Sequence, residues 1–167
     1  MIDNDFIITL SDIRKERAIQ KALGGNPGDD ASTIEALIEK HLIEDQISLF
    51  REIDIDEEAV NERLRGIQTP EGVSTGELRD AVRGELRRRE FAVQRFLPFI
   101  RVSDEELRQY FEKIAIPELQ KNGESIPTVE QGMLDVRPLV LAEKLSTEVG
   151  DWLAELRGRT TIEKILK

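Results

Sequence analysis

The chain has 167 residues and a formal net charge of -10, from 24 Lys and Arg against 34 Asp and Glu. This balance disfavours general binding to nucleic acids or to anionic membrane surfaces, and no stretch approaches the roughly 20 apolar residues of a membrane span. There is no cysteine and one histidine, His41, so the sequence offers no disulfide framework and no His and Cys metal set. We therefore expect no metal, no cofactor and no catalytic residue, and we interpret His41 as structural.

The two ends of the chain favour extended structure. In an extended segment Phe6, Ile8 and Leu10 fall on one face and Ile7 and Thr9 on the other, which is typical of a half-buried strand. The run from Thr160 to Leu166 carries β-compatible Thr and Ile side chains. We expect these two segments to pair as a small β element in an otherwise mainly α protein.

Capping patterns predict the first helices. Ser11 is expected to begin a helix that runs to about Leu23 and stops at the glycine-rich loop 24–28. Ser32 and Glu35 form a capping-box pattern at the start of the segment with the broadest apolar stripe. It is the longest segment with helical apolar periodicity, and we expect its helix to be the centre of the core.

Two further helices follow in the same way. Asp54 or Asp56 is expected to cap a shorter helix that ends near Gly66. Ser74 and Glu77 form a second capping box, which predicts the start of a long helix. The basic run within that helix is interleaved with glutamates, a pattern typical of an ion-paired, solvated helix face rather than of a polyanion site.

In the last third of the chain we expect the end of the long helix, the start of another helix, and a segment with only a weak helical pattern. Pro98 should end or kink the long helix, and Ser103 with Glu106 forms a third capping box. The pattern weakens over residues 117–138, which we interpret as a linker. It recovers over residues 139–167, for which we expect a helix and the final strand. The organisation is thus one domain, with the first strand and helices in residues 5–116.

Large aromatic side chains gather around the Pro98 bend. Most bulky apolar groups are core residues. In an open arrangement of helices, however, some could line a groove that accepts an extended chain. The candidate residues for contact with such a chain are Phe91, Phe96, Phe99, Tyr110 and Phe111.

Four segments, in this order along the chain, resemble the chaperone module of the SurA and PrsA type of extracytoplasmic folding factors. They are NDFIITLSDIRKE near the start, HLIEDQISLFREIDIDEEAVNERL, VSDEELRQYFEK, and WLAELRGRTTIEKIL at the end. In that family the first and last segments form one chaperone domain, and parvulin-type prolyl isomerase domains are inserted between them. Here about 25 residues separate Lys113 from Leu139, far fewer than a domain needs. The isomerase domain is therefore expected to be absent.

The resemblance implies an ATP-independent periplasmic chaperone, a holdase that binds unfolded outer-membrane or secreted polypeptides through an apolar cleft. Two alternatives remain open. One is a prolyl isomerase-related protein with residual activity. The other is a structural or dimerisation domain that binds a defined partner, and this partner can be a second copy of the chain. The hairpin-turn pattern at Asp3-Asn4-Asp5 also leads us to expect that upstream residues with a first strand have been removed. The periplasmic location that the resemblance implies leads us to expect that a signal peptide has been removed as well.

Overall fold

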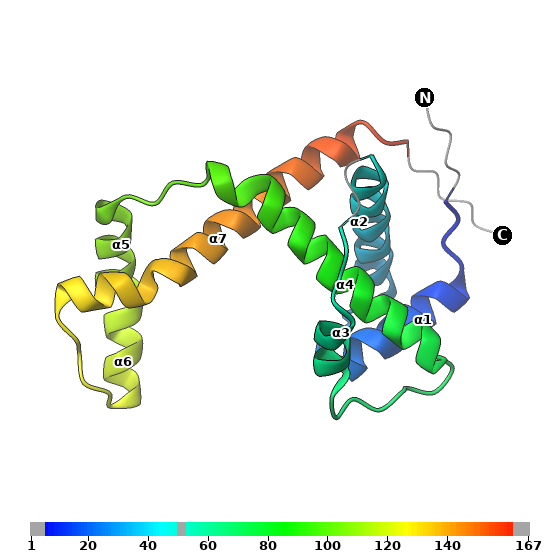
Figure 1. Cartoon of the computed structure of the whole chain (residues 1–167), viewed down its shortest axis with the longest axis horizontal. Coiled ribbons are helices and arrows are strands. Elements are labelled where there is room, and N and C mark those ends of the chain that lie inside the picture. Colours follow the sequence, from blue (N-terminus) through cyan, green and yellow to red (C-terminus); the bar gives the residue numbers. More distant parts are fainter. Residues whose placement is uncertain (1–5, 50–52, 162–167) are drawn as a thin grey trace. The chain divides into compact units, whose positions relative to one another are not determined.

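The computed structural model describes residues 6–49 and 53–161 and is mainly helical (Figure 1). The prediction of a mainly α protein is confirmed. The α-helices of the described residues are α1 (Leu10–Ala22), α2 (Asp30–Ser48), α3 (Glu57–Leu64), α4 (Thr75–Phe96), α5 (Asp104–Tyr110), α6 (Ile116–Asn122) and α7 (Val129–Gly158). A 3-10 turn, η1 (Leu97–Phe99), follows α4, and a π-helical turn, η2 (Phe111–Ala115), joins α5 to α6.

The predicted β element is not found in the described part of the chain. Residues 6–9 have no regular structure, and Leu10 already belongs to α1. The reason is a capping box that the strand-like alternation obscured. Thr9 caps α1, since its Oγ1 accepts from the Asp12 backbone N–H at 3.3 Å and its own N–H donates to Asp12 Oδ2 at 2.8 Å. The predicted partner strand lies almost entirely outside the described residues, and Thr160 and Thr161 are not in a strand.

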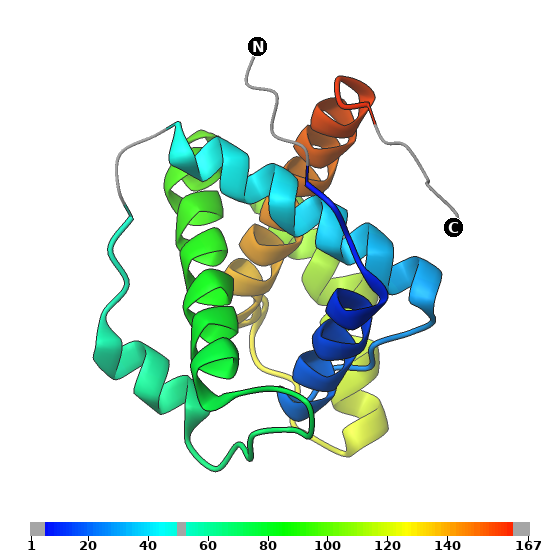
Figure 2. The ribbon, with the colours of Figure 1, turned by 90° about the vertical axis from the view of Figure 1, so that its right-hand side faces the viewer.

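The chain divides into two compact units, one formed by Met1–Phe91 with Leu156–Lys167 and one by Ala92–Glu155. We call them unit 1 and unit 2. In unit 1, α1 packs against α2, and a core forms around Ile19, Val73 and Leu78. Figure 2 shows α1 to α4 in blue to green. The partly buried side chains around this core come from α1, α3, α4 and the loop before α4.

The helix starts of unit 1 match the predicted caps in part. Asp56 caps α3, and Ser74 with Glu77 forms the predicted box before α4. The predicted Ser32 cap of α2 is wrong by one turn. Asp29 is the cap, and its Oδ1 accepts from the Ser32 backbone N–H at 2.8 Å. Both residues are good caps, and the one nearer the glycine-rich loop is used.

Ion pairs join the helices of unit 1. Glu57 on α3 pairs with Arg79 and Arg83 on α4, and Glu44 on α2 pairs with Arg87 and Arg88 on α4. These contacts confirm the interpretation of the basic run as an ion-paired helix face.

Two contacts extend this network to the ends of unit 1. Lys15 on α1 lies 2.5 Å from Glu77 at the start of α4. Arg157, in the last turn of α7, pairs with Glu35 on α2, so the final part of the chain is tied to unit 1.

In unit 2, the helical run from Asp104 to Asn122 lies beside the first part of α7 (Figure 1). Their shared core consists of Leu107, Phe111, Val136 and Val140. Ser103 and Glu106 form the predicted capping box of α5, and α4 ends just before Pro98 as predicted. We call residues 104–144 the hairpin, because the short loop 123–128 connects its two helical arms.

The residues predicted as a linker, 117–138, are largely helical. They contain most of α6 and the first ten residues of α7. Pro138 lies inside α7 instead of before it, which was the signal that misled the sequence prediction. The buried contacts of Gly132 and Val136 hold the helix on the core across this position. A proline there costs the helix one hydrogen bond, because it offers no N–H to the carbonyl of Leu134.

Candidate polypeptide-binding surface

The five predicted aromatic residues do not form one surface. Phe91 is buried in α4 and belongs to unit 1, whereas the other four belong to unit 2. Within unit 2, Phe111 is 1% exposed in the core and Tyr110 packs beside it. Phe96 is half-buried, and Phe99 is the exposed member at 82%. Phe99 is therefore the member of the set with the most surface to offer a bound chain.

Phe96 takes part in a small cluster with Trp152 of α7. The two rings meet edge to face, with centroids 5.5 Å apart and an interplanar angle of 61°. The guanidinium carbon of Arg95 lies 5.4 Å from the Phe96 centroid and 5.3 Å from the Trp152 centroid. Such aromatic and cation–π contacts stabilise packing, so we assign this cluster to the structure of unit 2.

Phe111 fits against a glycine of α7. A Cβ at Gly132 would lie 2.2 Å from Phe111 Cε2, a distance that real side chains do not tolerate. Any residue other than glycine at position 132 would therefore force the ring or the helix to move. Phe111 and Gly132 fix how the two arms of the hairpin pack.

Unit 2 exposes large apolar side chains that the sequence prediction missed. Leu134 is 62% exposed and Leu139 is 54% exposed, both on α7. The signal in the sequence is the run MLDVRPLVLAEKL, where apolar residues are too frequent for one helix face. Val136 and Val140 lie in the core and Met133 packs against it, whereas Leu134 and Leu139 are left outside. The exposed large apolar residues of unit 2 are Leu97, Phe99, Ile114, Ile126, Val129, Leu134 and Leu139.

The exposed face of α7 near Pro138 can be defined from helix geometry. Residues four apart on a helix are neighbours on its surface. Leu134 is therefore next to Pro138, Asp135 is next to Leu139, and all four are exposed. We call Leu134, Asp135, Pro138 and Leu139, with the following Ala142, the α7 outer face.

The α7 outer face is bordered by carboxylates. Glu130 precedes Leu134 by one turn, and Glu143 follows Leu139 by one turn. Among the described residues, neither they nor Asp135 makes an ion pair, although Asp135 accepts a hydrogen bond from Gln131 at 2.7 Å. One basic residue, Arg137, stands nearby. The whole hairpin has nine acidic and five basic residues.

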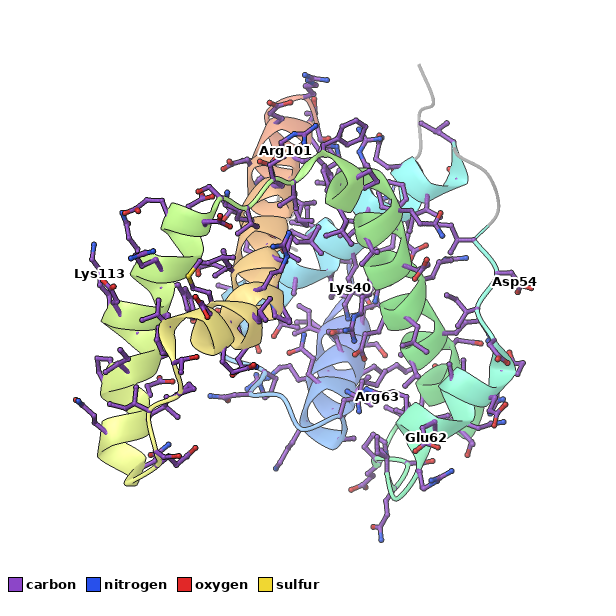
Figure 3. The ribbon with its side chains drawn as sticks, turned by 60° about the vertical axis from the view of Figure 1, so that its left-hand side comes forward. Lys40, Asp54, Glu62, Arg63, Arg101 and Lys113 are labelled. Atoms are coloured by element: carbon purple, nitrogen blue, oxygen red, sulfur yellow. The ribbon has the colours of Figure 1, made fainter. Side chains whose placement is uncertain are left out.

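An ion pair joins the two arms of the hairpin. Lys144 Nζ on α7 lies 2.5 Å from Glu106 Oε1 on α5 and donates to the Arg101 carbonyl oxygen at 2.7 Å. Figure 3 labels Arg101 in the segment that precedes α5. The hydrogen bond from Lys144, with those from Ser103, lowers the pKa of Glu106 to about 2. Glu106 therefore stays charged at any physiological pH.

Unit 1 contains a charged cavity of about 300 Å³ beside the glycine-rich loop. Lys40 on α2 and Arg63 on α3 line it, and Figure 3 labels both. Lys40 pairs with Glu16, whose side chain is 7% exposed, and Arg63 Nε lies 3.5 Å from Glu85 Oε1. Arg88, the third cation of the lining, pairs with Glu44. Since each cation has a carboxylate partner, the cavity has no uncompensated charge with which to attract an ionic ligand.

His41 lies away from any cluster of metal ligands. Its ring stacks on that of Phe6, with centroids 4.0 Å apart, and its Nε2 lies 3.5 Å from Asp45 Oδ2. Among residues 6–49 and 53–161, no group of three or more His, Cys, Asp or Glu side chains is placed to hold a metal ion. The helices of this described part also include none that is long and apolar enough to cross a bilayer.

Comparison with known proteins gives no relative. No family model, no curated protein and no solved structure matches the chain. The class of this protein is therefore defined by its fold, its charge and its exposed surface alone. This is a mainly helical, acidic protein of two units, one of which exposes apolar side chains on a helical hairpin.

Proposed function

We propose that this protein is an ATP-independent chaperone, a holdase that binds unfolded polypeptides through the exposed apolar side chains of unit 2. The observation that carries the proposal is the exposure of Leu134, Leu139 and Phe99 on a unit that has a well-packed core of its own. A folded unit that keeps large apolar residues outside has surface available for a partner.

The energetics suit reversible binding of many sequences. Covering apolar surface gains about 25 cal/mol per Å², and ordering the bound chain offsets part of this gain. The result is modest affinity with little dependence on exact sequence. Such binding can slow aggregation without a nucleotide to drive release.

The cellular setting forms part of the same proposal. The order of the four segments that resemble SurA and PrsA chaperone modules supports a periplasmic site of action. Unfolded outer-membrane or secreted polypeptides are the clients that this resemblance implies. The lack of space for a parvulin domain supports a binding role in place of prolyl isomerisation.

A dimerisation domain is the second candidate, because exposed apolar side chains can also cover one another in a pair of chains. Two copies that each carry a net charge of -10 repel each other, which favours a foreign partner over a second copy. Light scattering over a hundredfold range of concentration separates the two. The holdase proposal expects a constant monomer mass, and a mass that doubles supports the dimer.

The test of the proposed function is suppression of aggregation. The full chain is mixed with a chemically denatured model protein and with an unfolded outer-membrane polypeptide, and light scattering is followed after dilution. We expect suppression at near-stoichiometric ratio and no effect of added ATP. Undiminished aggregation at several-fold excess would refute the proposal.

A further inference from the structure

We infer that the α7 outer face selects unfolded segments in which apolar side chains are flanked by Lys or Arg. This inference rests on the proposed function and names the kind of segment that the same unit binds. It follows from three features that meet on one helix face, namely exposed apolar side chains, carboxylates and a carbonyl without a helical donor.

The first feature is a set of exposed apolar side chains on α7. Leu134, Pro138 and Leu139 are all exposed, whereas Gly132, Val136 and Val140 of the same helix are buried. α7 therefore carries exposed apolar side chains besides those that the core of unit 2 covers. The exposed ones are available to the apolar side chains of a bound segment.

The second feature is the charge around that area. Asp135 lies within the outer face, and Glu130 and Glu143 lie one turn before Leu134 and one turn after Leu139, against one cation, Arg137. In unit 1, Glu57 and Glu44 pair with arginines of α4, whereas these three carboxylates have no ion-pair partner among the described residues. A basic side chain on the bound segment would supply the missing partner.

The third feature is the backbone at Pro138. Because residue 138 has no N–H, the carbonyl of Leu134 lacks the donor that an α-helix normally provides four residues later. Leu134 and Pro138, the two residues between which this hydrogen bond is missing, are both exposed. The carbonyl offers an acceptor to the ammonium or guanidinium group of a segment whose apolar side chains cover the leucines.

The same features argue against the other occupants of an apolar face. A second copy of this chain brings the same carboxylates to the contact, so like charges would face each other. An acidic segment would suffer the same repulsion. A segment with both apolar and basic side chains can cover the exposed leucines and also pair with the carboxylates.

The test compares two peptides with the same apolar side chains and flanking side chains of opposite charge. Each carries a fluorophore and the same apolar side chains, and the flanking positions hold Lys in one peptide and Glu in the other. Binding to the full chain is measured by fluorescence anisotropy at low and at physiological salt. We expect the Lys peptide to bind at least tenfold more tightly at low salt and to lose most of that advantage at high salt. Equal affinities at low salt would overturn the inference.

Variants locate the interaction. The double variant Leu134→Ser with Leu139→Ser should weaken the Lys peptide severalfold, and Glu130→Gln with Asp135→Asn and Glu143→Gln should remove the difference between the two peptides. Leu49→Ser and Glu71→Gln, both at exposed positions of unit 1, serve as matched controls and should change neither result. Unchanged binding in the outer-face variants would overturn the inference.

The inference and the proposed function can fail separately. If the protein suppresses aggregation but binds both peptides equally, the chaperone function stands and the selection for basic segments is wrong. If it neither suppresses aggregation nor binds either peptide, both are wrong. If light scattering shows that the Leu134→Ser variant breaks a dimer, the outer face is a contact between copies, and the inference is overturned.

Discussion

The carboxylates that face α4 in unit 1 and those of the α7 outer face in unit 2 differ in whether they have cationic partners. In unit 1, Glu57 and Glu44 each hold two arginines of α4, and these pairs join three helices. On the α7 outer face, the carboxylates have no cationic partner among the described residues and stand beside exposed leucines. The difference indicates that these carboxylates of unit 1 hold its own helices together, whereas those of the α7 outer face remain available to a partner.

The packed and exposed aromatics of unit 2 should respond very differently to truncation. Phe111→Ala removes a fully buried ring from the hairpin core and should lower the free energy of unfolding by about 4 kcal/mol. Phe99→Ala changes a side chain that is largely in solvent and should alter it by less than about 0.5 kcal/mol. Urea unfolding followed by Trp152, the one tryptophan of the chain, reports on unit 2 directly. Similar losses for both variants would contradict the assignment of core and surface.

Two glycines of α7 provide a matched pair. Gly132→Ala places a Cβ against the Phe111 ring and should destabilise unit 2 by about 2 to 3 kcal/mol. Gly150→Ala meets no atom within 4 Å and should stabilise the helix by up to about 1 kcal/mol. The same fluorescence measurement compares them. A Gly132→Ala variant as stable as Gly150→Ala would show that the hairpin arms do not pack as described.

Unit 1 should depend on its least exposed ion pair. Glu16→Ala leaves Lys40 and Gln20 without the acceptor they share and should lower the free energy of unfolding by about 2 kcal/mol, less than for a fully buried pair because Lys40 is partly exposed. Circular dichroism measures the loss. The Trp152 signal of unit 2 serves as the internal control, and an equal effect on it would count against separate units.

Acid should weaken the ion pair between Glu106 and Lys144, which joins the two arms of the hairpin. The folded-state pKa of Glu106 is about 2 and its ordinary value is 4.5, so the unfolded chain binds more protons between these values. The contribution of Glu106 to stability is therefore complete above about pH 4.5 and lost as the pH falls toward 2. Lys144→Met removes the main cause of the low pKa. Its unfolding midpoint should fall less between pH 7 and pH 3 than that of the wild type, and an identical fall would exclude this role.

Local rules predicted most of the fold. Ser74, Ser103 and Asp56 mark helix starts through contacts within a few residues, and such contacts are readable in sequence. The errors at Thr9 and Pro138 arise where two local signals compete. At Thr9 a capping box outweighs a strand-like alternation, and at Pro138 the packing of Gly132 and Val136 outweighs a helix breaker.

The candidate surface was harder to predict, because exposure depends on which face of a helix the rest of the fold covers. Size and clustering near Pro98 selected five aromatics, and of these Phe99 has the greatest exposure while Phe91 and Phe111 are buried. Leu134 falls in the segment predicted as a linker, and Leu139 falls at the start of the predicted last helix, so the sequence marks neither as exposed surface. Their exposure depends on how α7 packs against the core of unit 2, which contacts between residues distant in sequence determine.

The most direct test of the central claim is site-specific cross-linking to an unfolded client. The chain has no cysteine, so Leu134→Cys and Leu49→Cys each carry one photo-reactive probe at positions with the same exposed fraction, 62%, in unit 2 and unit 1 respectively. Each labelled protein is irradiated with a denatured polypeptide during dilution, and the adducts are counted by mass spectrometry. The account predicts strong adducts from position 134 and few from position 49. Equal yields from the two positions, or none from position 134, would contradict it.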